Sequence, residues 1–278
     1  MKTSDFSKWS KGVGGYTLPA PDPVIPSENP ADGEVRDLGK RLAAPENCVC
    51  GGRLWIGGDF PPGHPDFGKV VMCACEKARQ EKNTRQLRWN DSGILNYVKE
   101  GTLISQSFSS YSDEANPDCV QGKRYAISWS QDNPDAKPWL VLQGKPGIGK
   151  THLAIAATAA AIGAGQQAVF VTATEFASRA RREARDGTLD TYLTFLKNAE
   201  CLILDDLGRE YKTDFSIDVV FEVLDFRYFN WKRTLTTTNH TMEELATIFG
   251  EPMRSRLMDT NRSRFANMTG KDIRRFGA

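Results

Sequence analysis

The chain has 278 residues, of which 40% are hydrophobic and 26% charged, with six cysteines and a formal net charge of +1 at pH 7. This composition excludes fibrous, disordered and disulfide-scaffold classes, and at roughly 150 residues per domain the length allows one large domain or two modest ones. No apolar run reaches the roughly 18 residues of a membrane span, so we expect a cytoplasmic protein without a membrane partner, in which clustered cysteines bind metal more often than they pair.

The N-terminal part of the chain lacks the apolar content of a packed core. Gly and Pro are frequent from Gly12 to Gly33, so we predict that residues 1–46 form a flexible tail. Residues 47–91 contain two C-x-C pairs around a turn-rich loop, formed by Cys48, Cys50, Cys73 and Cys75. Four thiolates can close a tetrahedral Zn²⁺ site, and its binding energy of roughly 10–16 kcal/mol in small fingers replaces a missing core.

We therefore predict that residues 47–91 form a Cys-rich zinc module. His64 lies inside the loop and is an alternative ligand to one thiolate. Cysteines without a metal and an iron–sulfur cluster are the other interpretations of the same pattern. A polar stretch compatible with a helix follows at residues 76–89, and residues 92–137 are predicted to be a linker and lead-in.

The pattern changes after Pro138. Short apolar runs at residues 139–143, 168–172, 201–205 and 234–238 alternate with longer segments that are compatible with helices. Such an alternation predicts an α/β domain with a parallel sheet over residues 138–278. Two of the helices have a predicted buried stripe, formed by Phe176, Ala180 and Ala184 in one and by Ile217, Val220, Phe221 and Leu224 in the other.

A phosphate-binding pattern follows the first of these strands. The segment from Gly144 to Thr151 reads GKPGIGKT, which matches the eight-residue P-loop and lies between a predicted strand and a predicted helix. Its glycines let backbone N–H groups surround a phosphate at a helix N-terminus, Lys150 reaches the β- and γ-phosphates, and the Thr151 hydroxyl ligates Mg²⁺. The alternative is a Gly-rich turn without a ligand. The predicted ATP-binding set is Gly144, Pro146, Gly147, Ile148, Gly149, Lys150, Thr151 and His152.

Two later strands end in polar side chains. The strand at residues 201–205 ends in Asp205 and Asp206, of which the first would hold Mg²⁺ and the second would orient and deprotonate the attacking water. The strand at residues 234–238 is followed by Asn239, which can hydrogen-bond the γ-phosphate or the water. An acidic turn and a plain Asn turn are the alternative interpretations.

Together these motifs resemble the AAA+ superfamily, and more narrowly the DnaC/DnaI-type bacterial helicase loaders and the related IstB-type transposition ATPases. The resemblance covers roughly residues 108–278, and its further matches are Leu204–Gly208, Arg227-Tyr228, Thr237–Asn239, Ser255–Leu257 and Gly270–Arg274. It implies a five-stranded parallel sheet in the order 5-1-4-3-2, ATP hydrolysis, and self-association through the ATP site.

The resemblance also assigns Arg256 as an arginine finger that enters the site of a neighbouring subunit, although an exposed arginine on a helix is the alternative. Only 22 residues follow Arg256, too few for the usual helical lid, so a sensor role for Arg274 stays open. Asp206 replaces the glutamate that is usual in AAA+ proteins, and its shorter side chain suggests slow hydrolysis.

A group of arginines, here called the basic arc, lies on the predicted helix between the strand at residues 168–172 and the strand that ends in Asp205. Its members are Arg179, Arg181, Arg182 and Arg185. Four guanidinium groups on one face can follow a phosphate backbone, and single-stranded DNA is the expected partner, although Glu183 and Asp186 also allow pairing within the helix.

The leading hypothesis is a helicase loader that binds a hexameric, DnaB-like replicative helicase through its N-terminal region. Cysteine-bearing N-terminal segments in relatives of the loaders favour it. A transposition ATPase that binds duplex DNA, a metal-stabilised adaptor with structural nucleotide, and a small-molecule kinase are the competing hypotheses.

Overall fold

The computed structural model describes residues 55–57, 62, 64, 67, 69–98, 106–111, 119–131, 136–209, 213–270 and 272. These residues fall into two compact units, one ending at Leu87 and the other beginning at Arg88. No helix among the described residues is long and apolar enough to cross a membrane.

The smaller unit contains a two-stranded antiparallel sheet and the start of a long helix. Strand β1 (Trp55–Gly57) pairs with β2 (Val70–Met72), and α1 (Ala74–Asp91) extends beyond the predicted helix at both ends. Cys73 is buried and Cys75 half-buried at the beginning of α1. Cys48 and Cys50 lie outside the described residues, and in the part of the chain that the structure describes no three His, Cys, Asp or Glu side chains gather as metal ligands. The zinc site therefore stays a prediction.

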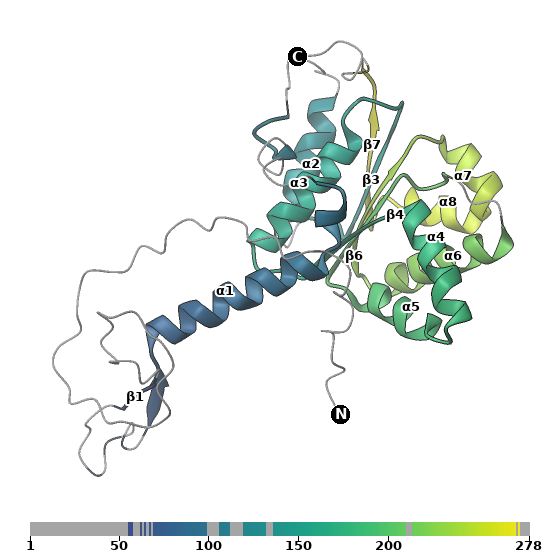
Figure 1. Ribbon diagram of the computed structural model, residues 1–278. Helices are drawn as coiled ribbons and strands as arrows, with labels where there is room; N and C mark the ends of the chain where they lie inside the picture. Colours follow the sequence, from purple (N-terminus) through teal and green to yellow (C-terminus); the bar gives the residue numbers. More distant parts are fainter. Residues whose placement is uncertain are drawn as a thin grey trace. The chain divides into compact units, whose positions relative to one another are not determined.

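The larger unit is built on a five-stranded parallel sheet (Figure 1). Its strands are β3 (Trp139–Gly144), β4 (Ala168–Thr172), β5 (Cys201–Asp205), β6 (Arg233–Thr238) and β7 (Ser263–Met268). They are arranged β4-β5-β6-β3-β7, which is the predicted order 5-1-4-3-2 when the strands are counted from β3. The α/β fold with a parallel five-stranded sheet is thus confirmed.

Helices cover both faces of this sheet (Figure 1). One face packs against α2 (Val120–Ser130) and α3 (Lys150–Gly163), with a short 3-10 helix, η2 (Ile94–Asn96), joining the same core. The other face packs against the helices α4 (Ala173–Arg185), α5 (Leu189–Asn198), α6 (Asp214–Phe229), α7 (Met242–Phe249) and α8 (Glu251–Leu257). Alternate residues of β3 enter opposite cores because successive strand side chains point to opposite faces. Helix α2 arises from the region predicted as linker and lead-in.

The predicted buried stripes need two corrections. In α4 Ala184 is exposed and Glu183 is buried instead, because the Glu183 carboxylate accepts a hydrogen bond from the Thr188 hydroxyl (2.5 Å) and faces the guanidinium of Arg179 (3.4 Å). In α6 the predicted Ile217 and Phe221 are only half-buried, and the fully buried apolar side chains are Val219, Val220, Val223 and Leu224.

Arg227 on α6 is a buried cation that joins three elements of the larger unit. Its side chain has 0% exposure and donates to the carbonyl oxygens of Leu196 (2.8 Å) and Ala199 (2.9 Å) at the end of α5. It also donates to the Thr234 hydroxyl on β6 (3.0 Å). Burial lowers the pKa of Arg227 to about 9, so the side chain remains charged at neutral pH, where the carbonyl dipoles at the helix C-terminus favour a cation.

Candidate functional site

The P-loop joins the carboxyl end of β3 to the first turn of α3, where its glycines adopt conformations that other residues avoid. Gly147 has φ 81° and Gly149 has φ 97°, in the left-handed region. A Cβ atom at Gly149 would lie 2.6 Å from Cε2 of Tyr111, whose hydroxyl donates to the Ile148 carbonyl (3.0 Å). The loop conformation therefore depends on glycine for backbone freedom and for space.

Lys150 lies under this loop at the first position of α3. Its side chain is buried, and Nζ donates to the carbonyl oxygens of Gly144 (2.7 Å) and Lys145 (2.9 Å). Its third donor contact is to Oδ1 of Asn239, at 2.7 Å. The ammonium group is therefore already positioned among the loop's acceptors, which phosphate oxygens of a bound nucleotide can replace.

Asp205, at the end of β5, is the buried acid of the site. Its carboxylate accepts hydrogen bonds from the Thr151 hydroxyl (3.0 Å) and from the Thr237 hydroxyl on β6 (2.6 Å). Burial raises the pKa of Asp205, and the two hydroxyl donors act in the opposite direction. A carboxylate beside a threonine hydroxyl is an oxygen donor set of the kind that Mg²⁺ prefers, so Thr151 and Asp205 fit a magnesium ion.

Asp206 follows directly and has a left-handed backbone, with φ 64°. Its amide donates to the Thr237 hydroxyl (2.9 Å), and its carboxylate accepts from Arg209 (2.9 Å) and from the side-chain amide of Asn239. Because Asn239 also contacts Lys150, its single amide group joins the lysine of the P-loop to this acid. The ends of three adjacent parallel strands thus bring Lys150, Asp206 and Asn239 together, as expected for the carboxyl edge of such a sheet.

Several residues of this site were not singled out by sequence reasoning. Thr237 touches both acids, yet its motif match gave it no role. The segment at residues 106–111 packs on the P-loop through Tyr111, and its Ser107 carbonyl lies 2.9 Å from Nε2 of His152. The Asp272 carboxylate lies against Gly147, since a Cβ there would be 1.8 Å from Oδ1. Thr237 and Asp272 had a sequence signal, which was their position within the matches at residues 237–239 and 270–274.

Arg256 lies apart from these residues in the described chain. It is on α8, where it forms an ion pair with Asp225 and its guanidinium lies over the rings of Phe221 (5.1 Å) and Phe229 (5.4 Å). An arginine finger acts on a second subunit, so this position within one chain is compatible with that role.

The four arginines of the basic arc on α4 differ in their contacts and exposure. Arg179 is half-buried, lies over the Tyr192 ring (4.6 Å) and pairs with Glu183, and Arg181 donates to the Ser216 hydroxyl (2.9 Å). Arg181, Arg182 and Arg185 are exposed, and the last two lie in the last turn of the helix. Three of the four guanidinium groups are therefore accessible to an external anion.

Comparisons with known proteins agree with this geometry. Residues 79–264 match the family of IstB-like ATP-binding proteins. The chain is 32% identical over 117 residues to an ATP-binding protein of insertion sequence IS5376 from Geobacillus stearothermophilus, which covers 42% of this chain and 46% of that protein. It is 28% identical over 119 residues to the replicative helicase loader DnaC of Escherichia coli (strain K12), which covers 42% of this chain and 49% of DnaC.

The chain therefore spans about half the length of these two curated relatives. Its fold is similar to the crystal structure of the DnaC helicase loader, with a TM-score of 0.54 and 24% identity over 61% of this chain and 99% of that one.

Proposed function

The chain belongs to the family of IstB-like ATP-binding proteins and has the AAA+ ATPase fold, and we propose that it is an ATP-dependent loader of a replicative helicase. The observation that carries the ATPase part is the joining of Lys150, Asp205, Asp206 and Asn239 at one edge of the sheet. The N-terminal cysteines support the loader over the transposition ATPase, because the resemblance implies that a cysteine-bearing N-terminal segment contacts the helicase in relatives of the loaders.

The geometry suggests how the residues would act on ATP. Backbone N–H groups of the P-loop and the Lys150 ammonium hold the phosphates, and Thr151 and Asp205 hold Mg²⁺, which neutralises charge on the β- and γ-phosphates when bound. Asp206 orients a water molecule and accepts its proton as the water oxygen bonds to the γ-phosphorus. The bond from that phosphorus to the β–γ bridging oxygen breaks, and ADP leaves with the electron pair. Asn239 holds Asp206 before nucleotide binds and turns toward the γ-phosphate when ATP is present.

Two further parts of the proposal concern assembly and DNA. Arg256 enters the ATP site of a neighbouring copy, so hydrolysis depends on self-association. The exposed Arg181, Arg182 and Arg185, with the half-buried Arg179, contact the phosphates of single-stranded DNA. The partner is a hexameric replicative helicase of the DnaB type.

The zinc module is also part of this proposal. Cys73 and Cys75 stand at the start of α1 in a unit whose described strands are three residues long, so a metal would supply stability that side chains do not. We expect one Zn²⁺ per purified chain by elemental analysis and none after Cys73→Ser and Cys75→Ser. A zinc-free chain that still folds contradicts this part alone.

Retention of a partner from a cell extract tests the function. The immobilised full chain, loaded with ATP, should retain a replicative helicase, and a Lys150→Ala chain should not. Retention of a transposase instead would favour the second candidate, a transposition ATPase, which the match to the IS5376 protein supports. The two candidates also differ in DNA preference, because the loader should prefer single strands and the transposition ATPase duplex. A chain that retains neither partner and does not hydrolyse ATP with DNA present contradicts both.

A further inference from the structure

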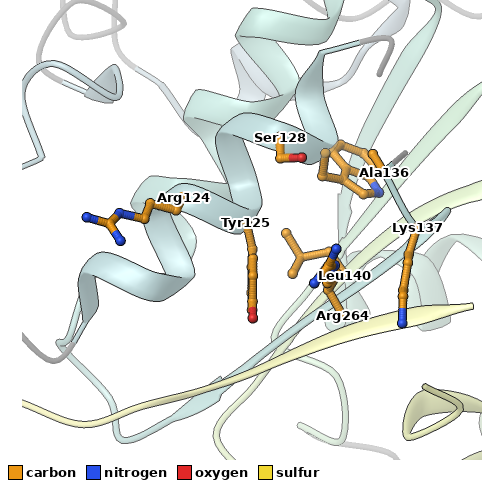
Figure 2. A pocket seen from close by; sticks show the side chains of 8 residues that line it. Arg124, Tyr125, Ser128, Ala136, Lys137, Leu140 and Arg264 are labelled. Atoms are coloured by element: carbon orange, nitrogen blue, oxygen red, sulfur yellow. The ribbon is translucent and has the colours of Figure 1, made fainter. Parts of the chain in front are cut away.

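A small basic cavity lies between α2 and the edge strand β7 in the larger unit. It has a volume of about 240 Å³, and its polar and aromatic lining consists of Arg124, Tyr125, Ser128, Trp129, Lys137 and Arg264 (Figure 2). Lys137 precedes β3 and Arg264 is the second residue of β7, so the cavity opens toward the amino ends of the strands. The P-loop is at the opposite, carboxyl end, and the cavity is therefore separate from the nucleotide site.

The cavity is positively charged. Arg124, Lys137 and Arg264 line it, and no acidic side chain is among the lining residues that the structure describes. Within the described part of the chain neither Arg124 nor Arg264 forms an ion pair, whereas Lys137 donates to the Thr260 carbonyl. Figure 2 shows Tyr125 extending from α2 toward β7, with Arg124 pointing away from it at the rim. The exposed guanidinium groups of Arg124 and Arg264 thus have no anionic partner among the described residues.

The aromatic rings at the cavity orient arginines and leave little room for a stacked base. The Arg264 guanidinium lies over the Tyr125 ring at 5.3 Å, and the Arg233 guanidinium lies over the Trp129 ring at 5.0 Å. A guanidinium stacked on a ring keeps its N–H edge free for a phosphate or carboxylate. The Trp129 indole N–H is already used by the Pro138 carbonyl, at 2.9 Å. The lining therefore selects for an anion.

The size of the cavity limits that anion. Its volume is below the roughly 300–1,000 Å³ of pockets that enclose whole small molecules, so it admits a phosphate group and part of a sugar. We propose that this cavity binds a backbone phosphate of single-stranded nucleic acid, as a second contact in addition to the α4 arginines. The inference rests on the DNA-binding part of the proposed function. It places a DNA contact near the amino ends of the strands, whereas the ATP site lies at their carboxyl ends.

The dependence of binding on salt tests the proposal. An oligo(dT) of about 20 nucleotides, long enough to exceed the roughly 4–16 nucleotides of one site, is titrated with the full chain at several salt concentrations. For single strands each phosphate contact adds about 0.7 to the slope of log K against log salt, so Arg264→Gln should lower the slope by about 0.7 and the affinity by about fivefold at roughly 0.1 M salt. Arg124→Gln together with Arg264→Gln should lower it further.

Matched controls separate this site from general charge. Lys82→Gln removes one exposed charge from α1 and should leave the slope unchanged. Arg264→Lys keeps the charge but loses the paired N–H donors of the guanidinium, so its affinity should lie between those of Arg264→Gln and the unaltered chain. Each variant should bind a fluorescent ATP analogue like the unaltered chain, which shows that it is folded. The proposal would be overturned if Arg264→Gln and the unaltered chain had equal slopes, or if Lys82→Gln lowered the slope as much as Arg264→Gln. It would also be overturned if the unaltered chain did not bind the oligonucleotide.

A second arm distinguishes nucleic acid from free phosphate. Calorimetry with inorganic phosphate on a Lys150→Ala background, in which the P-loop is impaired, should show no binding at millimolar concentration that depends on Arg264. Binding that is lost in Arg264→Gln while the oligonucleotide slope is unchanged would identify a free-phosphate site and overturn the proposal. Retention of the helicase is measured separately, so the proposed function can stand when this inference fails.

Discussion

Thr237 and Thr236 are neighbours on β6 whose buried hydroxyl groups have opposite environments. The Thr237 hydroxyl donates to Asp205 (2.6 Å) and accepts from the Asp206 amide (2.9 Å), whereas the Thr236 hydroxyl has no hydrogen-bond partner among the described residues. Valine has nearly the shape of threonine but cannot make these bonds. Thr237→Val should therefore destabilise the fold, and Thr236→Val should not.

The magnitudes follow from the bonds that are lost. A hydrogen bond to a carboxylate contributes about 1.5–3 kcal/mol and a neutral one about 0.5–1.5, so Thr237→Val should lower the free energy of unfolding by about 2–4 kcal/mol. Thr236→Val replaces an unsatisfied buried hydroxyl with a methyl group and should raise this free energy by about 1 kcal/mol or leave it unchanged.

Urea denaturation of the full chain without nucleotide, followed by circular dichroism, measures both variants against the unaltered protein. Nucleotide binding provides a second readout, because only Thr237→Val should weaken the binding that depends on Mg²⁺, through the loss of a group that orients Asp205. Two variants within about 1 kcal/mol of each other, or a larger loss in Thr236→Val, would refute the assigned hydrogen bonds.

The other predictions concern the acids and the loop. Because burial raises the pKa of Asp205 in the folded state, its contribution to stability is present below the ordinary value of 3.8 and is lost as the pH rises. Asp205→Asn should therefore have a higher urea midpoint than the unaltered chain at pH 7 without Mg²⁺, with no advantage below pH 3.8, and parallel pH profiles would contradict this. Gly149→Ala should lower the free energy of unfolding by about 2–5 kcal/mol and abolish nucleotide binding, because alanine is strained in a left-handed backbone and its Cβ would clash with Tyr111. A double-mutant cycle with Tyr111→Ala should show favourable coupling between the two substitutions. Additive effects would exclude the contact. Asp206→Asn and Arg256→Ala should each abolish ATP hydrolysis, while a mixture should regain activity if Arg256 acts on a neighbouring subunit; an inactive mixture of assembled chains argues against the finger.

The strands that are apolar throughout could be predicted from the sequence almost to the residue, because a buried strand in a parallel sheet needs no polar face. Strand β7 could not, since it lies at the sheet edge and its sequence SRFANM mixes buried, half-buried and exposed positions, with Arg264 and Asn267 exposed. Helix α2 was missed for a related reason. Its buried face is small, consisting of Gly122, Ala126, Trp129 and Ser130, and gives a weak apolar pattern.

In the candidate site, residues that belong to a short motif could be predicted from the sequence, and contacts between distant segments could not. The eight-residue P-loop motif identifies Lys150 and Thr151. The parallel order of the strands places Asp205 and Asn239 at the same carboxyl edge of the sheet. Tyr111 reaches the P-loop across 37 positions of sequence, and no local pattern encodes that contact. Arg227 belongs to a family match that gave it no role, and its full burial is possible because the carbonyl groups that accept its hydrogen bonds come from α5 and β6.

The chain of contacts from Lys150 through Asn239 to Asp206 bears on why an aspartate can stand where a longer glutamate is usual. Both Asp206 oxygens already accept hydrogen bonds, one from Asn239 and the other from Arg209, so the short side chain is held in one orientation. The same contacts oppose catalysis, because each Asp206 oxygen is already occupied by a donor that a water molecule would have to displace. All three protons of Lys150 have acceptors, and the Asn239 oxygen is one of them. A γ-phosphate, being charged, competes for Lys150 more strongly than a neutral amide does, so binding of ATP should release Asn239 from the lysine. We expect the amide that then turns to the phosphate to loosen its hold on Asp206, so that the proposed base becomes available only when nucleotide is present.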